Sequence, residues 1–113
     1  MERMIERGLL YDFYGELLTK HQQEIYSEIV FNDLSLSELS EAEGISRQGV
    51  FDLIKRCDKL LEGYEEKLKL IEKFKLIKSE VKDLNAVIDA EQGIDPKVKD
   101  MLREGLRIIV NVL

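Results

Sequence analysis

Apolar residues recur every three or four positions along most of the chain, which is the spacing of one face of an α-helix. The only proline stands near the C-terminal end, and Leu, Glu, Lys and Ile, all common in helices, are abundant. The pattern therefore predicts an all-α fold. Five helices are expected, at about residues 2–18, 19–31, 36–43, 47–90 and 96–113.

Capping residues set most of these boundaries. Thr19 with Gln22, and Ser35 with Glu38, have the form of two capping boxes. Asp95 precedes Pro96, and proline is common at the first position of a helix. No such signal interrupts residues 47–90, so one long helix of roughly 66 Å is the simplest interpretation. Gly63 is the expected place for a bend.

Residues 36–56 (LSELSEAEGISRQGVFDLIKR) have the features of a helix-turn-helix. Ser40 is the small residue expected where the two helices cross, and Gly44 can adopt the positive φ that the turn needs. Ser46 can cap the second helix, which leaves an ordered, positively polarised helix end suited to a phosphate. The pattern therefore predicts a motif of the kind that reads DNA.

At 100° per residue, the second helix turns Val50, Leu53, Ile54 and Cys57 inward. The candidate DNA-binding residues are those on the opposite face, its flanks and the tip: Ser46, Arg47, Gln48, Phe51, Asp52, Lys55, Arg56 and Lys59. Arginine can read guanine and glutamine can read adenine. The cations of the later turns are better placed for phosphates.

The charge of the chain supports a nucleic-acid site only in its middle part. The 113-residue chain has a net charge of −6, but residues 47–78 carry nine Lys and Arg against six Asp and Glu. A basic stripe on an acidic body is a usable footprint for nucleic acid.

Two parts of the chain are expected, a helical head at 1–62 and an extension at 63–113. The apolar stripe of the extension is too long for the head to cover. Another copy is therefore the economical partner, which predicts a homodimer joined through the C-terminal half.

The residues that carry chemistry are few, and we expect no enzyme, metal or cofactor. With one cysteine (Cys57) and one histidine (His21), no zinc site or Cys–His pair can be assembled. A single cysteine that faces inward, without a signal peptide or a membrane span, favours a cytoplasmic protein.

The helix-turn-helix block, together with Leu17–Thr19 before it, resembles region 4 of sigma-70 factors. The fuller pattern, LLYDFYGELLT and SRQGVFDLIKRCDKLLEGYEEKLKL, resembles the YlxM family of bacterial signal-recognition-particle-associated proteins over roughly the first 75 residues. The resemblance implies a cytosolic protein with a sigma-4-like helix-turn-helix, linked to the signal recognition particle pathway. One departure is Gly49, where such helices often carry alanine.

DNA binding with a regulatory role is the leading interpretation. One alternative is an accessory factor that binds the RNA or protein of the signal recognition particle. The other is a protein-interaction adaptor that keeps the helix-turn-helix fold without binding nucleic acid.

Overall fold

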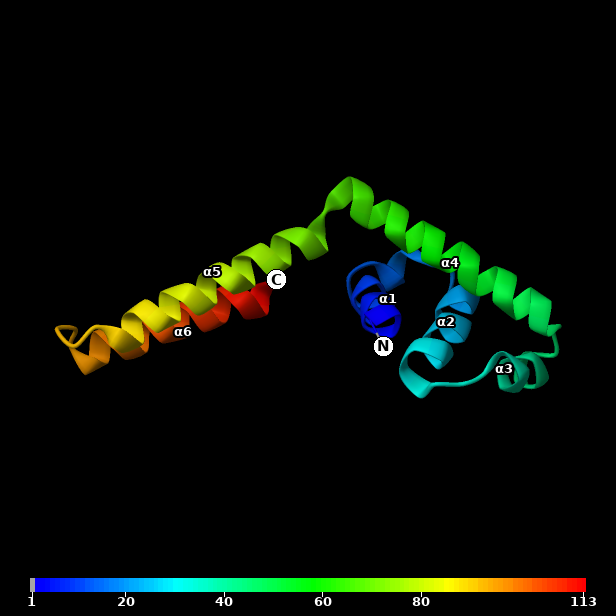
Figure 1. Ribbon diagram of the computed structural model, residues 1–113, viewed down its shortest axis with the longest axis horizontal. Helices are drawn as coiled ribbons and strands as arrows, with labels where there is room; N and C mark the ends of the chain where they lie inside the picture. The colour runs from blue at the N-terminus through cyan, green and yellow to red at the C-terminus, as the bar shows by residue number, and fades with distance from the viewer. Residues whose placement is uncertain (1) are drawn as a thin grey trace. The chain divides into compact units, whose positions relative to one another are not determined.

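The computed structural model describes the chain from Glu2 to Leu113, and over these residues it is all-α, as predicted. Figure 1 shows the order of the elements. The α-helices are α1 (Glu2–Tyr14), α2 (Lys20–Asn32), α3 (Leu36–Glu43), α4 (Arg47–Leu68), α5 (Leu70–Ala90) and α6 (Pro96–Val112), with a 3-10 helix, η1 (Gly15–Leu17), after α1. In this part of the chain, none of the helices has the length and apolarity to cross a membrane.

The predicted helix boundaries before α4 are confirmed, because local capping sets them. Thr19 accepts the amide of Gln22 at 3.2 Å, and the Gln22 side chain accepts the amide of Thr19 at 2.9 Å. Ser35 and Glu38 form the second reciprocal pair. Only the end of the first predicted helix differs, since its last turn is the 3-10 helix η1.

The chain divides into two units, of which the first ends at Ile71 and the second spans Glu72–Leu113. The division expected at 62/63 falls within α4, which continues to Leu68. In the first unit, α1, α2 and α3 all pack against α4 (Figure 1). Its core consists of side chains from each of these helices, among them Tyr14, Ile25, Tyr26, Leu39, Val50, Cys57 and Leu61.

The prediction of one helix over residues 47–90, bent at Gly63, is wrong. Gly63 lies inside α4, which ends at Leu68 and is capped by Lys69, a residue with a left-handed backbone and φ of 55°. Side chains then accept the first two amides of α5. The Tyr14 hydroxyl accepts the amide of Leu70 at 3.1 Å, and Glu65 Oε1 accepts the amide of Ile71 at 2.9 Å. These acceptors stabilise an interruption between two helices, which the apolar periodicity does not show.

The second unit contains the rest of α5 and all of α6, which lie side by side in Figure 1. Asp95 accepts the amide of Lys97 at 2.8 Å, so the predicted cap before Pro96 is confirmed. An ion pair joins Arg103 of α6 to Asp89 of α5. No residue of α6 is buried, although the helix has a pronounced apolar face.

Candidate nucleic-acid interface

The helix-turn-helix is formed by α3, a three-residue turn and the start of α4. Gly44 ends α3 with φ of 69°, as its position predicted. The Ser40 hydroxyl donates to the carbonyl of Ile45 at 2.5 Å and so holds the turn against α3. Ser46 accepts the amide of Gly49 at 3.0 Å, which satisfies one of the free amides at the start of α4. The turn is therefore fixed from both sides.

Every one of the predicted contact residues has an exposed side chain on α4 or at its start: Ser46, Arg47, Gln48, Phe51, Asp52, Lys55, Arg56 and Lys59. Five of them interact with one another or with α3. Arg47 lies 3.4 Å from the Ser37 hydroxyl, and the Gln48 amide donates to Asp52 at 2.9 Å. The ammonium group of Lys55 lies 5.2 Å from the centre of the Phe51 ring, within the range of a cation–π contact.

All of these exposed residues except Ser46 and Asp52 line two hollows on the surface of the first unit. A hollow of about 720 Å³ lies where α3 meets α4, between Ser35–Ser37 and the side chains of Arg47, Gln48 and Phe51. A groove of about 750 Å³ continues past Phe51, along Lys55 and Lys59, to α1. Phe51 lines both hollows. The exposed residues at the start of α4 and those in its middle therefore belong to one continuous surface. Asp52 lines neither of them.

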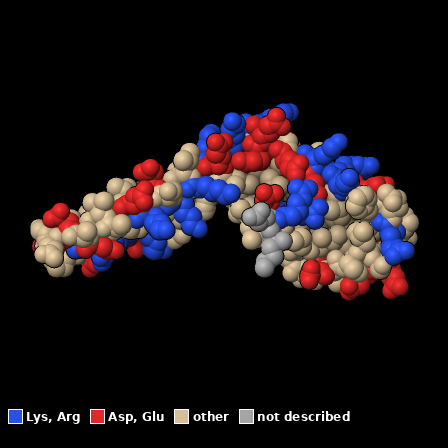
Figure 2. Space-filling view, viewed as in Figure 1, with Lys and Arg blue, Asp and Glu red and all other residues tan. Residues whose placement is uncertain are grey.

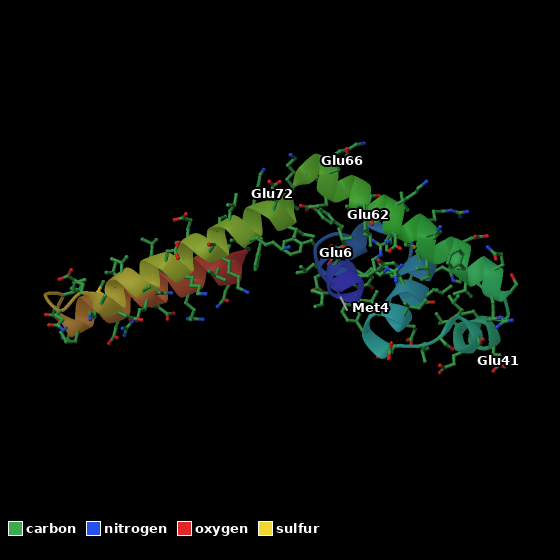
Figure 3. All side chains as sticks on the ribbon, in the orientation of Figure 1. Met4, Glu6, Glu41, Glu62, Glu66 and Glu72 are labelled. Atoms are coloured by element: carbon green, nitrogen blue, oxygen red, sulfur yellow. The ribbon has the colours of Figure 1, made fainter. Side chains whose placement is uncertain are left out.

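This surface is basic. Lys55, Arg56 and Lys59 form no ion pair within the part of the chain that the structure describes. Figure 2 shows Lys and Arg side chains over the middle of α4 and acidic side chains toward its C-terminal end. On α3, Glu41 points away from α4 (Figure 3). The middle of α4 is therefore electropositive, because its cations have no ion-pair partner among the described residues and these acidic side chains lie elsewhere.

Behind this surface lies a buried charge that was not among the predicted residues. Asp58 of α4 is 4% exposed and accepts hydrogen bonds from two helices. Arg7 donates to both of its carboxylate oxygens, at 3.0 and 2.7 Å, and the Tyr26 hydroxyl donates at 2.6 Å. Arg3 adds a bond of 3.1 Å and also reaches Glu62, which lies on the side of α4 that faces α1 (Figure 3).

The titration of Asp58 reflects two opposing effects. Burial raises the pKa of this carboxyl group, but the hydrogen bonds from Arg7 and Tyr26 and the nearby positive charges lower it more, so that the pKa lies below its ordinary value. The same burial and the bond to Asp58 raise the pKa of the Tyr26 hydroxyl. Asp58 therefore stays ionised and ties α1 and α2 to the helix that carries the candidate contact residues.

One sequence signal marks this cluster. Asp58 lies four residues after Ile54 and three before Leu61, so it falls on the buried stripe of α4. A charged residue in such a stripe needs a partner of opposite charge. The sequence does not say which of the arginines supplies it, since Arg3 and Arg7 are more than fifty residues away.

The single cysteine and the single histidine lie away from the basic surface. Cys57 is fully buried, and burial raises the pKa of its thiol to about 11, which leaves little thiolate at neutral pH. His21 is an exposed residue in the first turn of α2. Neither residue lies on the basic surface.

Comparison with known proteins agrees with this arrangement. Residues 1–101 match the model of the UPF0122 family, described as "Putative helix-turn-helix protein, YlxM / p13 like". A UPF0122 protein of Clostridium perfringens strain 13 is 39% identical over 111 residues, 98% of this chain and 99% of that protein. One of Thermoanaerobacter sp. strain X514 is 43% identical, with 89% and 88% covered, and one of Acetivibrio thermocellus is 41% identical, with 97% and 98% covered. The chain therefore belongs to the UPF0122 family of YlxM/p13-like proteins.

Proposed function

We propose that the protein binds duplex DNA through the exposed face of the first four turns of α4 and acts as a regulator. One observation carries this proposal: four cations, Arg47, Lys55, Arg56 and Lys59, are exposed on the helix that follows a tight, doubly fixed helix-turn-helix turn. An exposed second helix with polar residues at its tip is the element that enters the major groove in proteins of this class. The family description supports the motif.

Each residue has a role in this proposal. Arg47 and Gln48, at the helix tip, read base edges, and Asp52 orients the Gln48 amide by the 2.9 Å bond between them. Phe51, of which 40% is exposed, contacts thymine methyl groups. The phosphate contacts come from the basic residues of the later turns and from the capped helix start: Ser46, Lys55, Arg56 and Lys59.

We further propose a cytoplasmic protein whose regulatory role is tied to the signal recognition particle pathway. The resemblance of the first 75 or so residues to the YlxM family supports this assignment, and the resemblance to region 4 of sigma-70 supports contact through the same face of α4. Binding to the RNA or protein of that particle, and a purely protein-binding adaptor, are the competing functions.

The test is an unbiased capture from a cell lysate, in which bound DNA, bound RNA and bound proteins are identified together. Enrichment of a duplex DNA sequence, with affinity that falls steeply as salt rises, supports the proposal. Preference for structured RNA, or capture of nuclease-insensitive proteins with no enriched duplex DNA, contradicts it. The matched control is the variant Arg47→Ala, Gln48→Ala, Lys55→Ala and Lys59→Ala, which loses the enriched DNA if the assignment is correct.

We also propose that the second unit forms a homodimer. Along α6 the side chains of Met101 and Ile109 are 74% and 50% exposed, and an apolar groove of about 430 Å³ runs between them and Leu84 of α5. Gly105 lies in this groove, and apart from its chain neighbours and the backbone of its own helix no atom lies within 4 Å of the position that a Cβ would take. Such a surface leaves room for the close approach of another helix, and a second copy would cover it.

Light scattering at micromolar concentration tests the dimer. We expect a mass of twice the 13.1 kDa of the chain. The variant Met101→Glu with Ile109→Glu is expected to be monomeric, because both carboxylates would be buried in the interface. Met101→Leu with Ile109→Leu keeps the apolar surface and is the matched control. A parent protein with the mass of a single chain contradicts the proposal.

A further inference from the structure

The groove of about 750 Å³ beside α4 has an apolar floor. It lies within the first unit, between α1, the end of α2, the start of α3 and α4. Aliphatic and aromatic side chains from three helices and one connection form the floor: Ile29, Leu34, Leu36, Phe51 and Ile54. Such concave apolar surfaces suit the apolar face of a peptide or helix, and are of little use for contacts to a phosphate backbone.

The rim of the groove is positively charged. On the α1 side, Arg3 and Arg7 are balanced by Asp58 and Glu62, which they bind. On the α4 side stand Lys55, Arg56 and Lys59, which form no ion pair within the described part of the chain. The three cations give the groove a net positive edge. An occupant with carboxylates along that edge is favoured, and one with cations is repelled.

We propose that this groove docks a protein segment that carries apolar residues on one side and Asp or Glu residues beside them. The apolar side fills the floor, as in other helix-in-groove complexes, and the carboxylates pair with the three cations of α4. The exposed apolar face of α6 in a second copy does not fit this chemistry. Its flanks carry Lys97, Lys99, Arg103 and Arg107 against Asp100 and Glu104, which is the same sign of charge as the rim.

Docking has a consequence for DNA binding. Phe51, Lys55 and Lys59 line the groove and also belong to the proposed DNA-contact face. One surface cannot hold both ligands, so an acidic segment in the groove excludes DNA and would act as a regulator of it. This consequence rests on the proposed function, whereas the docking itself does not.

The probe is a fluorescein-labelled synthetic peptide of about 16 residues, long enough for a helix of about 24 Å. Leu and Phe occupy one helical face of the peptide and Glu the others. One control peptide has the same composition in scrambled order, and a second has Lys in place of Glu. Fluorescence anisotropy with the full-length protein measures the affinity of each. We expect the acidic amphipathic peptide to bind at least about tenfold more tightly than either control.

Variants locate the site. Phe51→Ala removes part of the floor, and Arg56→Ala with Lys59→Ala removes two of the three cations on the α4 side of the rim; each is expected to weaken binding of the acidic peptide several-fold. All three residues are exposed, so the fold is expected to persist, which circular dichroism checks. Lys20→Ala, an exposed lysine on α2 outside the groove, is the matched control. Equal binding of the three peptides, or binding that the groove variants leave unchanged, overturns the proposal.

Competition with duplex DNA separates this inference from the proposed function. Displacement of the peptide by DNA supports both. Selective peptide binding by a protein that binds no DNA contradicts only the DNA-binding function. DNA binding without selective peptide binding contradicts only the groove proposal. The same holds if the groove variants weaken binding of nucleic acid but leave binding of the peptide unchanged.

Discussion

The hydroxyl group of Tyr26 donates a 2.6 Å hydrogen bond to Asp58, a residue thirty-two positions further along the chain. With the two bonds from Arg7, this contact joins α1, α2 and α4 at one buried carboxylate. Apolar packing tolerates small rotations of a helix about its axis, but a set of directional bonds does not. We infer that the cluster sets which face of α4 points to solvent.

Replacement of Asp58 by alanine is expected to lower the free energy of unfolding of the protein by about 3 kcal/mol, because it leaves the half-buried Arg7 without its partner. A loss of this size is a large part of the stability of a small domain. Urea denaturation followed by circular dichroism measures it.

The matched control is Glu62→Gln. Glu62 pairs with Arg3, and about half of each of these side chains is exposed. Surface pairs of this kind contribute little, so a change of less than about 0.5 kcal/mol is expected. Equal losses of unfolding free energy for the two variants would mean that burial of the Asp58 cluster does not contribute to stability.

The stability of the protein is expected to fall in acid, in part through Asp58. Because the pKa of this carboxyl group is lower in the folded state, its contribution is present above the unfolded pKa of about 3.9. The contribution is lost as the pH falls through the folded value, since the folded state binds that proton less readily. Urea midpoints between about pH 5.5 and pH 2.5 measure the loss. Asp58→Asn should lose less stability over this window than the parent, and parallel curves would contradict the assignment.

Much of the first unit can be predicted because its signals are local. Thr19, Ser35 and Ser46 each bond to an amide three residues away, and Gly44 adopts the left-handed backbone that its place in the turn requires. The Asp58 cluster could not be predicted in the same way. Asp58 lies on the buried stripe, but its partners come from other helices, and the sequence does not pair them.

The end of α4 was missed for a related reason. The left-handed residue there is Lys69, not a glycine or asparagine, and the apolar spacing continues unbroken across it. Glu65, the acceptor for the amide of Ile71, is only six residues away, but Tyr14, the acceptor for the amide of Leu70, is fifty-six residues away and comes into reach only after the unit has folded. A tertiary contact therefore helps to decide where this helix ends. Gly63, where the sequence predicted a bend, remains helical.

Lys69→Gly is expected to stabilise the protein by about 0.5–1 kcal/mol, because glycine adopts positive φ without steric cost. Gly63→Ala is expected to stabilise it by a similar amount, about 1 kcal/mol, for the opposite reason: the position is helical and has room for a Cβ. Thermal melts measure both. An uninterrupted helix bent at Gly63 reverses the first result, since glycine at 69 would then destabilise.

The proposed DNA contact predicts two kinds of loss among the residues of α4. Arg47→Ala and Gln48→Ala should relax sequence preference, each by about 1–3 kcal/mol at one contacted base pair, because these residues are assigned to base edges. Lys55→Ala and Lys59→Ala should weaken binding to every sequence about equally. Each should also lower the slope of log affinity against log salt by about 1, since one counterion fewer is released.

Quantitative binding to a selected duplex and to its single-base variants, at several salt concentrations, separates the two kinds of residue. All four side chains are exposed, so the melting temperature is expected to change little and any loss of affinity belongs to the contact. Lys20→Ala on α2 controls for the removal of a single positive charge elsewhere on the first unit. If Lys20→Ala lowers affinity as much as Lys55→Ala does, attraction is general to the surface and α4 is not the contact helix. If Arg47→Ala weakens all sequences equally, the tip of α4 contacts phosphates and the bases are read elsewhere.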